Sequence, residues 1–332
     1  MKKLLLLLPL SLLLMTACND AAEIAKEMRR TSVTLNNENQ STGKTAELLL
    51  VMDKTWPEEV QDTVYLILAK PMTGLPQPEP MFSIYQTEPS LFKGDYTRRA
   101  NIIYLDVNEN FTEPNCKIER NPWSKPQVYA HIMAATRDEA IGMLAEKCDE
   151  ILQEMYANDI AKLQMNQAKT PNIELQNYVK EKFGILMTIP QEYAIAREGD
   201  GFLWLAYRTK KNDRFVMIYT SENKSMTRAM LIAKRNYITQ KYIEGETKEV
   251  YPRVVEQMGL PTYQPLTLWN KSGAQLRGLW ETEKDYMGGP FYQFSFINTN
   301  GECVTIDGFV FAPEEPKAVY MRQVEAIVKS VK

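Results

Sequence analysis

The stretch FYQFSFINTNGECVTIDGFVF, residues 291–311, decides the fold class of this chain. Residues 291–298 and 302–311 are rich in aromatic and β-branched side chains, which predicts two strands. Cys303 lies within the second run and is predicted to be a small strand residue. The centre of the second half of the chain is therefore expected to be a sheet.

The same pattern extends across the rest of the second half. Further strands are predicted at residues 192–197, 202–208, 214–220, 266–269 and 275–281. Helices are predicted at residues 173–183, 226–243 and 319–331, where apolar residues recur at helical spacing. Runs of strands punctuated by helices favour an α+β domain with a mainly antiparallel sheet over residues 170–332. The order of these elements is similar to that of PsbP-like and Mog1-like folds, a likeness that carries no function.

The first half of the chain, residues 45–169, is predicted to form another α+β domain with a mainly antiparallel sheet. Its strands are predicted at residues 46–52, 81–86, 101–107 and 127–134. Two capping boxes, Thr55 with Glu58 and Thr136 with Glu139, predict helix starts. The segment NQAKTPN, residues 166–172, interrupts the second helical pattern and places the domain boundary near residue 169.

The N-terminus, MKKLLLLLPLSLLLMTACND, has the composition of a signal peptide. Two lysines precede an apolar run at residues 4–14, which is shorter than the ~20 residues that a membrane-spanning helix needs. Residues 15–18, Met-Thr-Ala-Cys, resemble a bacterial lipobox, in which the cysteine is acylated and the bond before it is cut. We expect a lipoprotein signal peptide over residues 1–17 and a lipid anchor on Cys18. The alternative is an ordinary secretory signal with a chance cysteine.

The residues after Cys18 predict where the protein is delivered. Asn19 is not the aspartate that retains lipoproteins in the inner membrane of some bacteria, which favours the outer membrane and its periplasmic face. Residues 18–44 are polar, have no sustained apolar period, and are predicted to form a tether. The expected location is the cell envelope, with the membrane as a partner through the lipid anchor.

The composition argues against several classes of activity. The net charge of −3 and the lack of a basic block argue against a nucleic-acid partner, and no glycine-rich phosphate-binding motif supports a nucleotide. His131 is the only histidine and is predicted to be a structural strand residue. The cysteines lack the paired spacing of zinc sites, so we expect no metal and no other cofactor. Pairing of Cys116 with Cys148 stays open, although no essential disulfide is expected.

The most distinctive stretch is RGLWETEKDYMGGPF, residues 277–291. Its Gly-Gly-Pro sequence requires a sharp turn. Aromatic side chains crowd around that turn, and an arginine is placed to stack on them or to bind a carboxylate. These residues are candidates for a binding groove: Arg277, Trp280, Tyr286, Met287 and Phe291. The alternative is a hairpin whose aromatic side chains belong to the core.

The same stretch holds three acidic residues that alternate along the chain, Glu281, Glu283 and Asp285. A pair of carboxylates at a suitable separation is the machinery that glycosidases use. These three residues are the candidate acids of an alternative hypothesis, a hydrolase acting on envelope polysaccharide. The competing interpretation is a solvated strand edge that leads into a turn.

Several segments together resemble a family of uncharacterised Bacteroidota lipoproteins, grouped as a domain of unknown function. The resemblance is based on the lipobox, the helix start at Trp56, LPQPEPMF (75–82), RGLW with DYMGGPF, and DGFVFAP followed by RQVEAIVKS. It covers nearly the whole mature chain. It implies an exported lipoprotein and assigns neither an activity nor catalytic residues.

We therefore predict an envelope lipoprotein that is a non-catalytic binding or scaffold module for a protein, a peptide or a glycan. The prediction is based on the lipobox, the scarcity of histidine and the aromatic turn. The carboxylate-based hydrolase is retained as the alternative.

Overall fold

The computed structural model of the protein describes residues 40–243, 250–257, 259–283 and 286–332. Within these ranges the chain is a mixed α+β protein with two sheets and five α-helices, and residues Ser41–Lys332 form one compact unit. The predicted lipidation site Cys18 and the candidate acid Asp285 lie outside the described residues. None of the helices within these ranges combines the length and apolarity that crossing a membrane requires.

The N-terminal sheet has five strands in the order β2-β1-β3-β5-β4. They are β1 (Glu47–Val51), β2 (Ser83–Thr87), β3 (Asn101–Val107), β4 (Asn115–Arg120) and β5 (Val128–Ala134). The pairs β1–β2, β1–β3 and β3–β5 are parallel, and among the described strands of this sheet only β4 is antiparallel to its neighbour. The prediction of a mainly antiparallel sheet is therefore wrong for this half. The continuous apolar runs of β1 and β3 are those of strands that are covered on both faces, as parallel strands usually are.

Two helices pack on one face of this sheet, α2 (Glu58–Leu68) and α3 (Arg137–Gln167). The predicted capping box at the start of α3 is confirmed, because Thr136 and Glu139 bond each other's backbone N–H groups. The predicted box at Thr55 is wrong, because α2 begins after Pro57 and has no side-chain cap. The Thr55 backbone N–H donates instead to Asp53 Oδ1 at 2.8 Å. The opposite face of the sheet is covered in part by the short helices η2 (Pro89–Leu91) and η3 (Gly94–Arg98).

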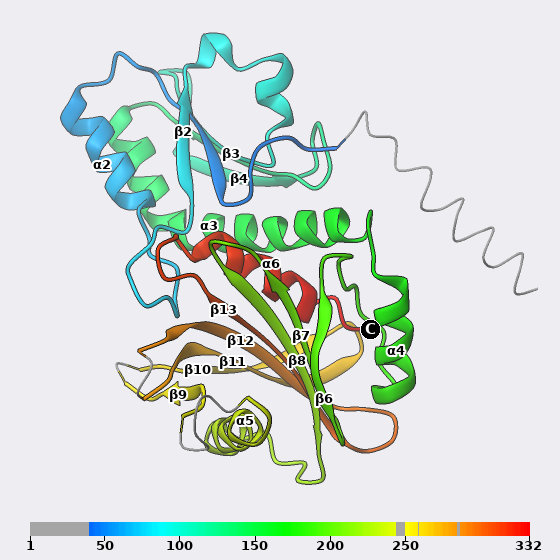
Figure 1. Cartoon of the computed structure of the whole chain (residues 1–332). Helices are drawn as coiled ribbons and strands as arrows, with labels where there is room; N and C mark the ends of the chain where they lie inside the picture. The colour runs from blue at the N-terminus through cyan, green and yellow to red at the C-terminus, as the bar shows by residue number, and fades with distance from the viewer. Residues whose placement is uncertain (1–39, 244–249, 258, 284–285) are drawn as a thin grey trace, which may run out of the picture. The chain divides into compact units, whose positions relative to one another are not determined.

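The C-terminal sheet has eight strands and is curled (Figure 1). They are β6 (Ala194–Gly199), β7 (Phe202–Arg208), β8 (Asp213–Ser221), β9 (Arg253–Val255), β10 (Thr262–Leu268), β11 (Lys271–Glu281), β12 (Gly288–Ile297) and β13 (Cys303–Phe311). All of its described pairings are antiparallel, as predicted for this half. β12 and β13, formed by the stretch quoted first, are central strands, and β13 lies between β12 and β8.

Helices cover both faces of the C-terminal sheet. They are α4 (Ile173–Phe183), α5 (Arg228–Tyr242) and α6 (Ala318–Val328). α4 and α6 share a core with one face, and α5 shares a core with the other. α6 also packs against α3, so it lies between the C-terminal sheet and the long helix of the N-terminal half (Figure 1). This position surrounds α6 with protein on most sides.

The folded chain begins before the end of the predicted tether. The backbone of Ser41 and Thr42 bonds the carbonyls of Lys125 and Arg98. The Lys162 ammonium on α3 donates to the carbonyls of Thr42 and Gly43, at 2.9 and 2.8 Å. Residues 41–43 are therefore held by α3 and by the loops before β3 and β5, within the segment that was predicted to be a polar tether up to residue 44.

Candidate functional site

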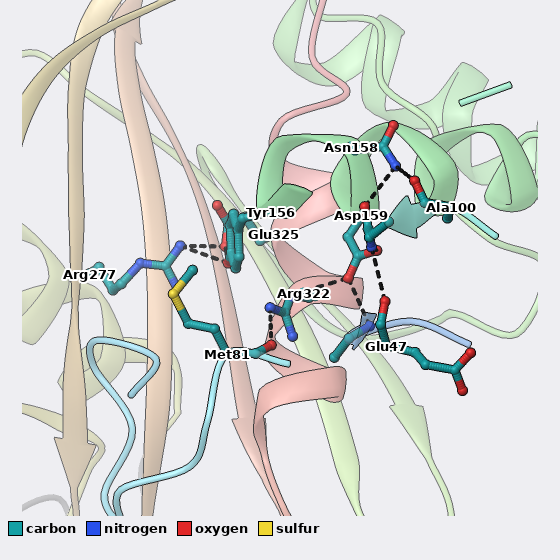
Figure 2. A network of polar contacts seen from close by, with 11 residues as sticks. Glu47, Met81, Ala100, Tyr156, Asn158, Asp159, Arg277, Arg322 and Glu325 are labelled. Atoms are coloured by element: carbon teal, nitrogen blue, oxygen red, sulfur yellow. Dashed lines mark hydrogen bonds and ion pairs between the residues drawn. The ribbon is translucent and has the colours of Figure 1, made fainter. Parts of the chain in front are cut away.

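Arg277, a predicted binding residue on β11, lies where three distant parts of the chain meet. Its Nη2 group bonds a carboxylate oxygen of Glu325 on α6 and donates to the hydroxyl of Tyr156 on α3 at 3.2 Å. The Tyr156 hydroxyl donates to the same Glu325 oxygen. Figure 2 shows these three side chains converging from the sheet and the two helices. The arginine therefore joins the C-terminal sheet to α6 and to α3.

Glu325 is held ionised by two cations although its side chain is fully buried. The second cation is Lys329, one helical turn later, whose Nζ lies 2.7 Å from Glu325 Oε1. Burial alone raises the pKa of Glu325, but Arg277 and Lys329 outweigh it and lower that pKa to about 2. Burial likewise opposes the charge on Arg277, and the Glu325 carboxylate raises the pKa of that guanidinium. Both groups stay charged at neutral pH.

A second buried ion pair continues the network toward the N-terminal sheet. Arg322 Nε lies 3.6 Å from Asp159 Oδ2, and neither side chain is exposed. Asp159 also accepts hydrogen bonds from the backbone N–H of Ala46 at 2.7 Å and from Asn101 Nδ2 at 2.9 Å (Figure 2). Burial raises the pKa of Asp159 and lowers the pKa of Arg322. The network thus runs from β11 through α6 and α3 to the start of the N-terminal sheet.

A cavity of about 290 Å³, which we name the Arg277 cavity, opens onto the outer end of this network. Three glutamines, two threonines and two methionines line it together with Tyr156, Arg277, Glu325 and Lys329. The side chain of Arg277 is 16% exposed and that of Lys329 is 24% exposed, whereas Glu325 is not exposed. Two cations facing one carboxylate leave one positive charge in excess at the cavity wall.

The lining of the Arg277 cavity is suited to binding rather than to proton transfer. A general acid or base needs a pKa near the working pH. Glu325, with a pKa of about 2, stays ionised, and burial raises the pKa of Tyr156 so that its hydroxyl stays protonated. The excess positive charge attracts an anion, and the amide and hydroxyl groups of the wall are hydrogen-bonding partners for a polar chain.

One wall of the Arg277 cavity is formed by the edge of the C-terminal sheet. β10 pairs with β11 and has no second neighbour among the described strands. Thr262 and Gln264 of β10 line the cavity, and Gln264 accepts a hydrogen bond from Gln275 of β11 at 2.8 Å. Pro265 lies within β10, as prolines in edge strands do, and removes one backbone N–H donor from this strand. The other backbone groups of this edge can pair with an extended peptide.

The structure does not bring the other predicted binding residues into this cavity. Trp280 is 4% exposed and Phe291 is fully buried, and both belong to the core under α5. Side chains at positions 277 and 280 of one strand point to opposite faces of the sheet, so Arg277 and Trp280 cannot share a groove. Tyr286 is 95% exposed, and Met287 is half-buried against the same core as Trp280.

The described candidate acids lie on an open surface. Glu281 and Glu283 both form ion pairs with Arg253, and their side chains are 48% and 49% exposed. A shared arginine on an exposed edge does not provide the enclosed carboxylate pair that glycoside hydrolysis requires. Within the described residues, the structure gives the hydrolase hypothesis no support from Glu281 or Glu283.

His131 and the cysteines occupy structural positions. His131 lies on β5, its Nε2 is 2.9 Å from Asp106 Oδ2, and its ring contacts those of Tyr104 and Tyr129. Cys116, Cys148 and Cys303 are free thiols. Within the described ranges, no three side chains of histidine, cysteine, aspartate or glutamate gather in a way that would hold a metal ion.

The partners of Arg277 were missed by the sequence reasoning. Arg322, Glu325 and Lys329 recur at spacings of three and four, which places them along one side of α6. They interrupt a helix that carries apolar residues around most of its circumference. Charged residues at helical spacing in an otherwise apolar helix indicate a helix that is buried between two layers of structure. This pattern could have identified Arg322 and Glu325 as buried charges. Nothing in the sequence connects them to residue 277.

Comparisons with known proteins match two consecutive families. Residues 41–168 match the family described as "Domain of unknown function (DUF8532)", and residues 172–330 match "Domain of unknown function (DUF4837)". These matches are consistent with the predicted uncharacterised family. No curated protein matches the chain.

Two solved structures show a weak similarity to the chain. One is a crystal structure from Bacteroides thetaiotaomicron VPI-5482, with 9% identity and a TM-score of 0.24 over 45% of this chain and 44% of that one. The other is the human StarD13 (DLC2) lipid transfer and protein localization domain, with 12% identity and a TM-score of 0.24 over 48% of this chain and 95% of that one. Both scores are too low to assign a fold, and the likeness to PsbP-like and Mog1-like folds stays a prediction.

Proposed function

We propose that the protein is a lipid-anchored envelope protein that binds an extended, acidic peptide segment of another envelope protein in the Arg277 cavity. The observation that carries this proposal is the excess positive charge of Arg277 and Lys329 beside a free sheet edge. An outer-membrane position facing the periplasm is part of the proposal and derives from the lipobox and Asn19.

The chemistry of the cavity wall favours a peptide among the three ligand classes predicted from the sequence. Glutamine and threonine side chains from α3 and the β10–β11 edge can bond the amide groups of an extended chain. Methionines adapt to varied side chains. Sugars are usually recognised by stacking on open aromatic faces, and the tyrosine that lines this cavity, Tyr156, is engaged with Glu325 and Arg277. A peptide carboxylate would meet the two cations.

The peptide proposal is tested by selecting a library of random peptides against the detergent-purified protein. We expect the recovered peptides to be enriched in aspartate and glutamate. Lys329→Gln removes a cation from the cavity wall and is expected to weaken binding of a recovered peptide about tenfold. Lys211→Gln is the matched control, because Lys211 pairs with Glu315 on the surface at 3.0 Å, away from the cavity.

Two outcomes would overturn the peptide proposal. One is a recovered set with no acidic preference. The other is an affinity that Lys329→Gln leaves unchanged or that Lys211→Gln lowers equally. Melting curves of both variants accompany the binding measurement, so that a loss of affinity through unfolding is recognised.

The anchor is tested separately by labelling cells with radioactive palmitate. We expect the label to enter the wild-type protein and to be absent from Cys18→Ala. Label in the variant, or none in the wild type, would disprove lipidation at Cys18 without affecting the peptide result.

A further inference from the structure

The turn between β10 and β11 places a tryptophan where a glycine is usual. Leu268 pairs with Lys271, which leaves a two-residue loop of Trp269 and Asn270. Trp269 has a φ of 54°, and Asn270 is not in the positive-φ region. A positive φ at the first of two loop residues is typical of a type II′ turn, in which that residue is normally glycine. A bulky aromatic side chain makes this conformation costly.

Packing does not account for Trp269. Its side chain is 66% exposed, so it contributes little to the core. A side chain that is exposed and sits on a strained backbone gains little stability from packing, and strained positions concentrate at functional surfaces. The structure therefore requires another explanation for an indole at this turn.

The neighbours of Trp269 form a small apolar surface with a basic rim, which we name the Trp269 patch. Lys332 Nζ lies 4.8 Å from the centre of the indole, and the backbone N–H of Lys332 bonds the carbonyl of Leu186 at 2.8 Å. Leu186 is 50% exposed. Lys271 of the same hairpin lines a shallow hollow together with Ile185, the residue before Leu186. Two exposed apolar side chains, Trp269 and Leu186, and two lysines thus lie near one end of the C-terminal sheet.

We propose that the Trp269 patch docks on the headgroup region of an anionic lipid bilayer. Tryptophan favours the interface between lipid and water, where its ring is buried and its N–H stays hydrated. Leu186 adds apolar area, and Lys271 and Lys332 complement anionic headgroups. The patch is small compared with the area that a stable protein interface buries.

The docking proposal is independent of peptide binding. It does not require the proposed lipid anchor, although the anchor would strengthen docking. A tether at Cys18 would hold the folded part close to the membrane, and a high effective concentration makes a weak contact sufficient. The Trp269 patch would then fix which side of the folded part faces the lipid.

The test uses residues 18–332 with Cys18→Ser, which contains every described residue and carries no acyl chain. Its binding to vesicles of phosphatidylethanolamine and phosphatidylglycerol is measured by co-sedimentation and by quenching of tryptophan emission with brominated lipids. We expect binding that Trp269→Gly weakens about tenfold. Lys271→Gln and Lys332→Gln are expected to weaken binding to these vesicles and to leave binding to phosphatidylcholine vesicles unchanged.

The chain offers a matched control in Tyr286. Tyr286 is also an exposed aromatic residue at positive φ, 51°, and it lies between β11 and β12, at the other end of β11. Tyr286→Gly is expected to leave vesicle binding unchanged. Because Trp269→Gly relieves backbone strain, its melting temperature is expected to stay the same or to rise, so lost binding would not reflect unfolding.

Three outcomes would overturn the docking proposal. The first is a lack of vesicle binding by the unlipidated wild-type chain. The second is equal binding by wild type and Trp269→Gly, or equal losses in Trp269→Gly and Tyr286→Gly. The third is a wild-type dimer that Trp269→Gly dissociates, which would assign the patch to protein contact. None of these results changes the peptide-binding measurement.

Discussion

Two clusters of arginine and carboxylate lie along β11 and use the same chemistry in opposite surroundings. In one, Arg277 pairs with the fully buried Glu325. In the other, Arg253 pairs with Glu281 and Glu283, whose side chains are about half exposed at 48% and 49%. The comparison leads us to expect that burial, and not the type of ion pair, decides how much stability is lost when one partner of a charged cluster is removed.

The physical basis of this difference is solvation. Exposed ion pairs are screened by water and salt and contribute about 0–1 kcal/mol. In a buried pair, removing one partner leaves an uncompensated charge in a medium of low dielectric constant, which costs about 3–5 kcal/mol. The first cluster is therefore expected to respond strongly to substitution and the second weakly.

The largest expected effect is that of Arg277→Met. It leaves Lys329 as the remaining ion-pair partner of Glu325 among the described residues, and we expect the free energy of unfolding to fall by about 3–5 kcal/mol. Urea denaturation followed by circular dichroism measures it. The double variant Arg277→Met with Glu325→Met removes both charges and should recover more than half of the loss. A single variant that costs under about 1 kcal/mol would place the buried cluster in the same class as the exposed one.

The next effect is the acid sensitivity of the buried cluster. The folded-state pKa of Glu325, about 2, is below its ordinary value of 4.5. A depressed carboxyl pKa gives stabilisation that is present above pH 4.5 and is lost as the pH falls toward 2. The shift corresponds to about 3 kcal/mol. Urea titrations across this window should show the loss in the wild type and in Glu281→Gln, and a much smaller loss in Glu325→Gln. Equal slopes in all three proteins would contradict the assignment.

A smaller effect is expected from Arg253→Gln, which disrupts the exposed cluster. We expect the free energy of unfolding to change by less than about 1 kcal/mol, and the difference to disappear at high salt because salt screens exposed charges. Thermal melts at low and high ionic strength check this. A salt-independent loss as large as that of Arg277→Met would show that exposure is not the deciding variable.

The smallest effect is expected from removing a single exposed acid. Glu283→Gln should change the free energy of unfolding by no more than about 0.5 kcal/mol. It should also leave the affinity for a selected acidic peptide unchanged, because Glu283 does not line the Arg277 cavity. Loss of peptide binding in this variant would move the binding site to the exposed edge.

Local patterns in the sequence predicted most elements of the fold but not the direction of their pairing. The strands Asn101–Val107 and Phe202–Arg208 and the helix Ile173–Phe183 have the predicted bounds. β4 was missed because its sequence, NCKIER, is mostly polar and has too few apolar residues to indicate a strand. The parallel pairing of the N-terminal sheet was also missed. A continuous apolar run indicates a buried strand but does not indicate whether its neighbours are parallel or antiparallel to it.

The candidate site was predictable only in part for the same reason. Arg277 was selected for its place in an unusual stretch, and it does line a cavity. Its aromatic neighbours in sequence, Trp280 and Phe291, belong to the opposite face of the sheet. Its partners in the structure, Tyr156 and Glu325, lie on the helices α3 and α6. Their proximity to Arg277 results from tertiary packing, which local sequence spacing does not encode.

The attachment of residues 42–46 to α3 has a mechanical consequence. A pull on the chain at Ser41 would be transmitted through the turn at Ala46 to β1, which lies between two parallel strands, β2 and β3. Strand pairs pulled lengthwise load their hydrogen bonds together, rather than opening one after another. Lys162 and Asp159 of α3 bind the backbone at the point where the load enters, at Thr42, Gly43 and Ala46. Force applied from the N-terminal side would therefore be shared between the long helix and the loops that precede β3 and β5.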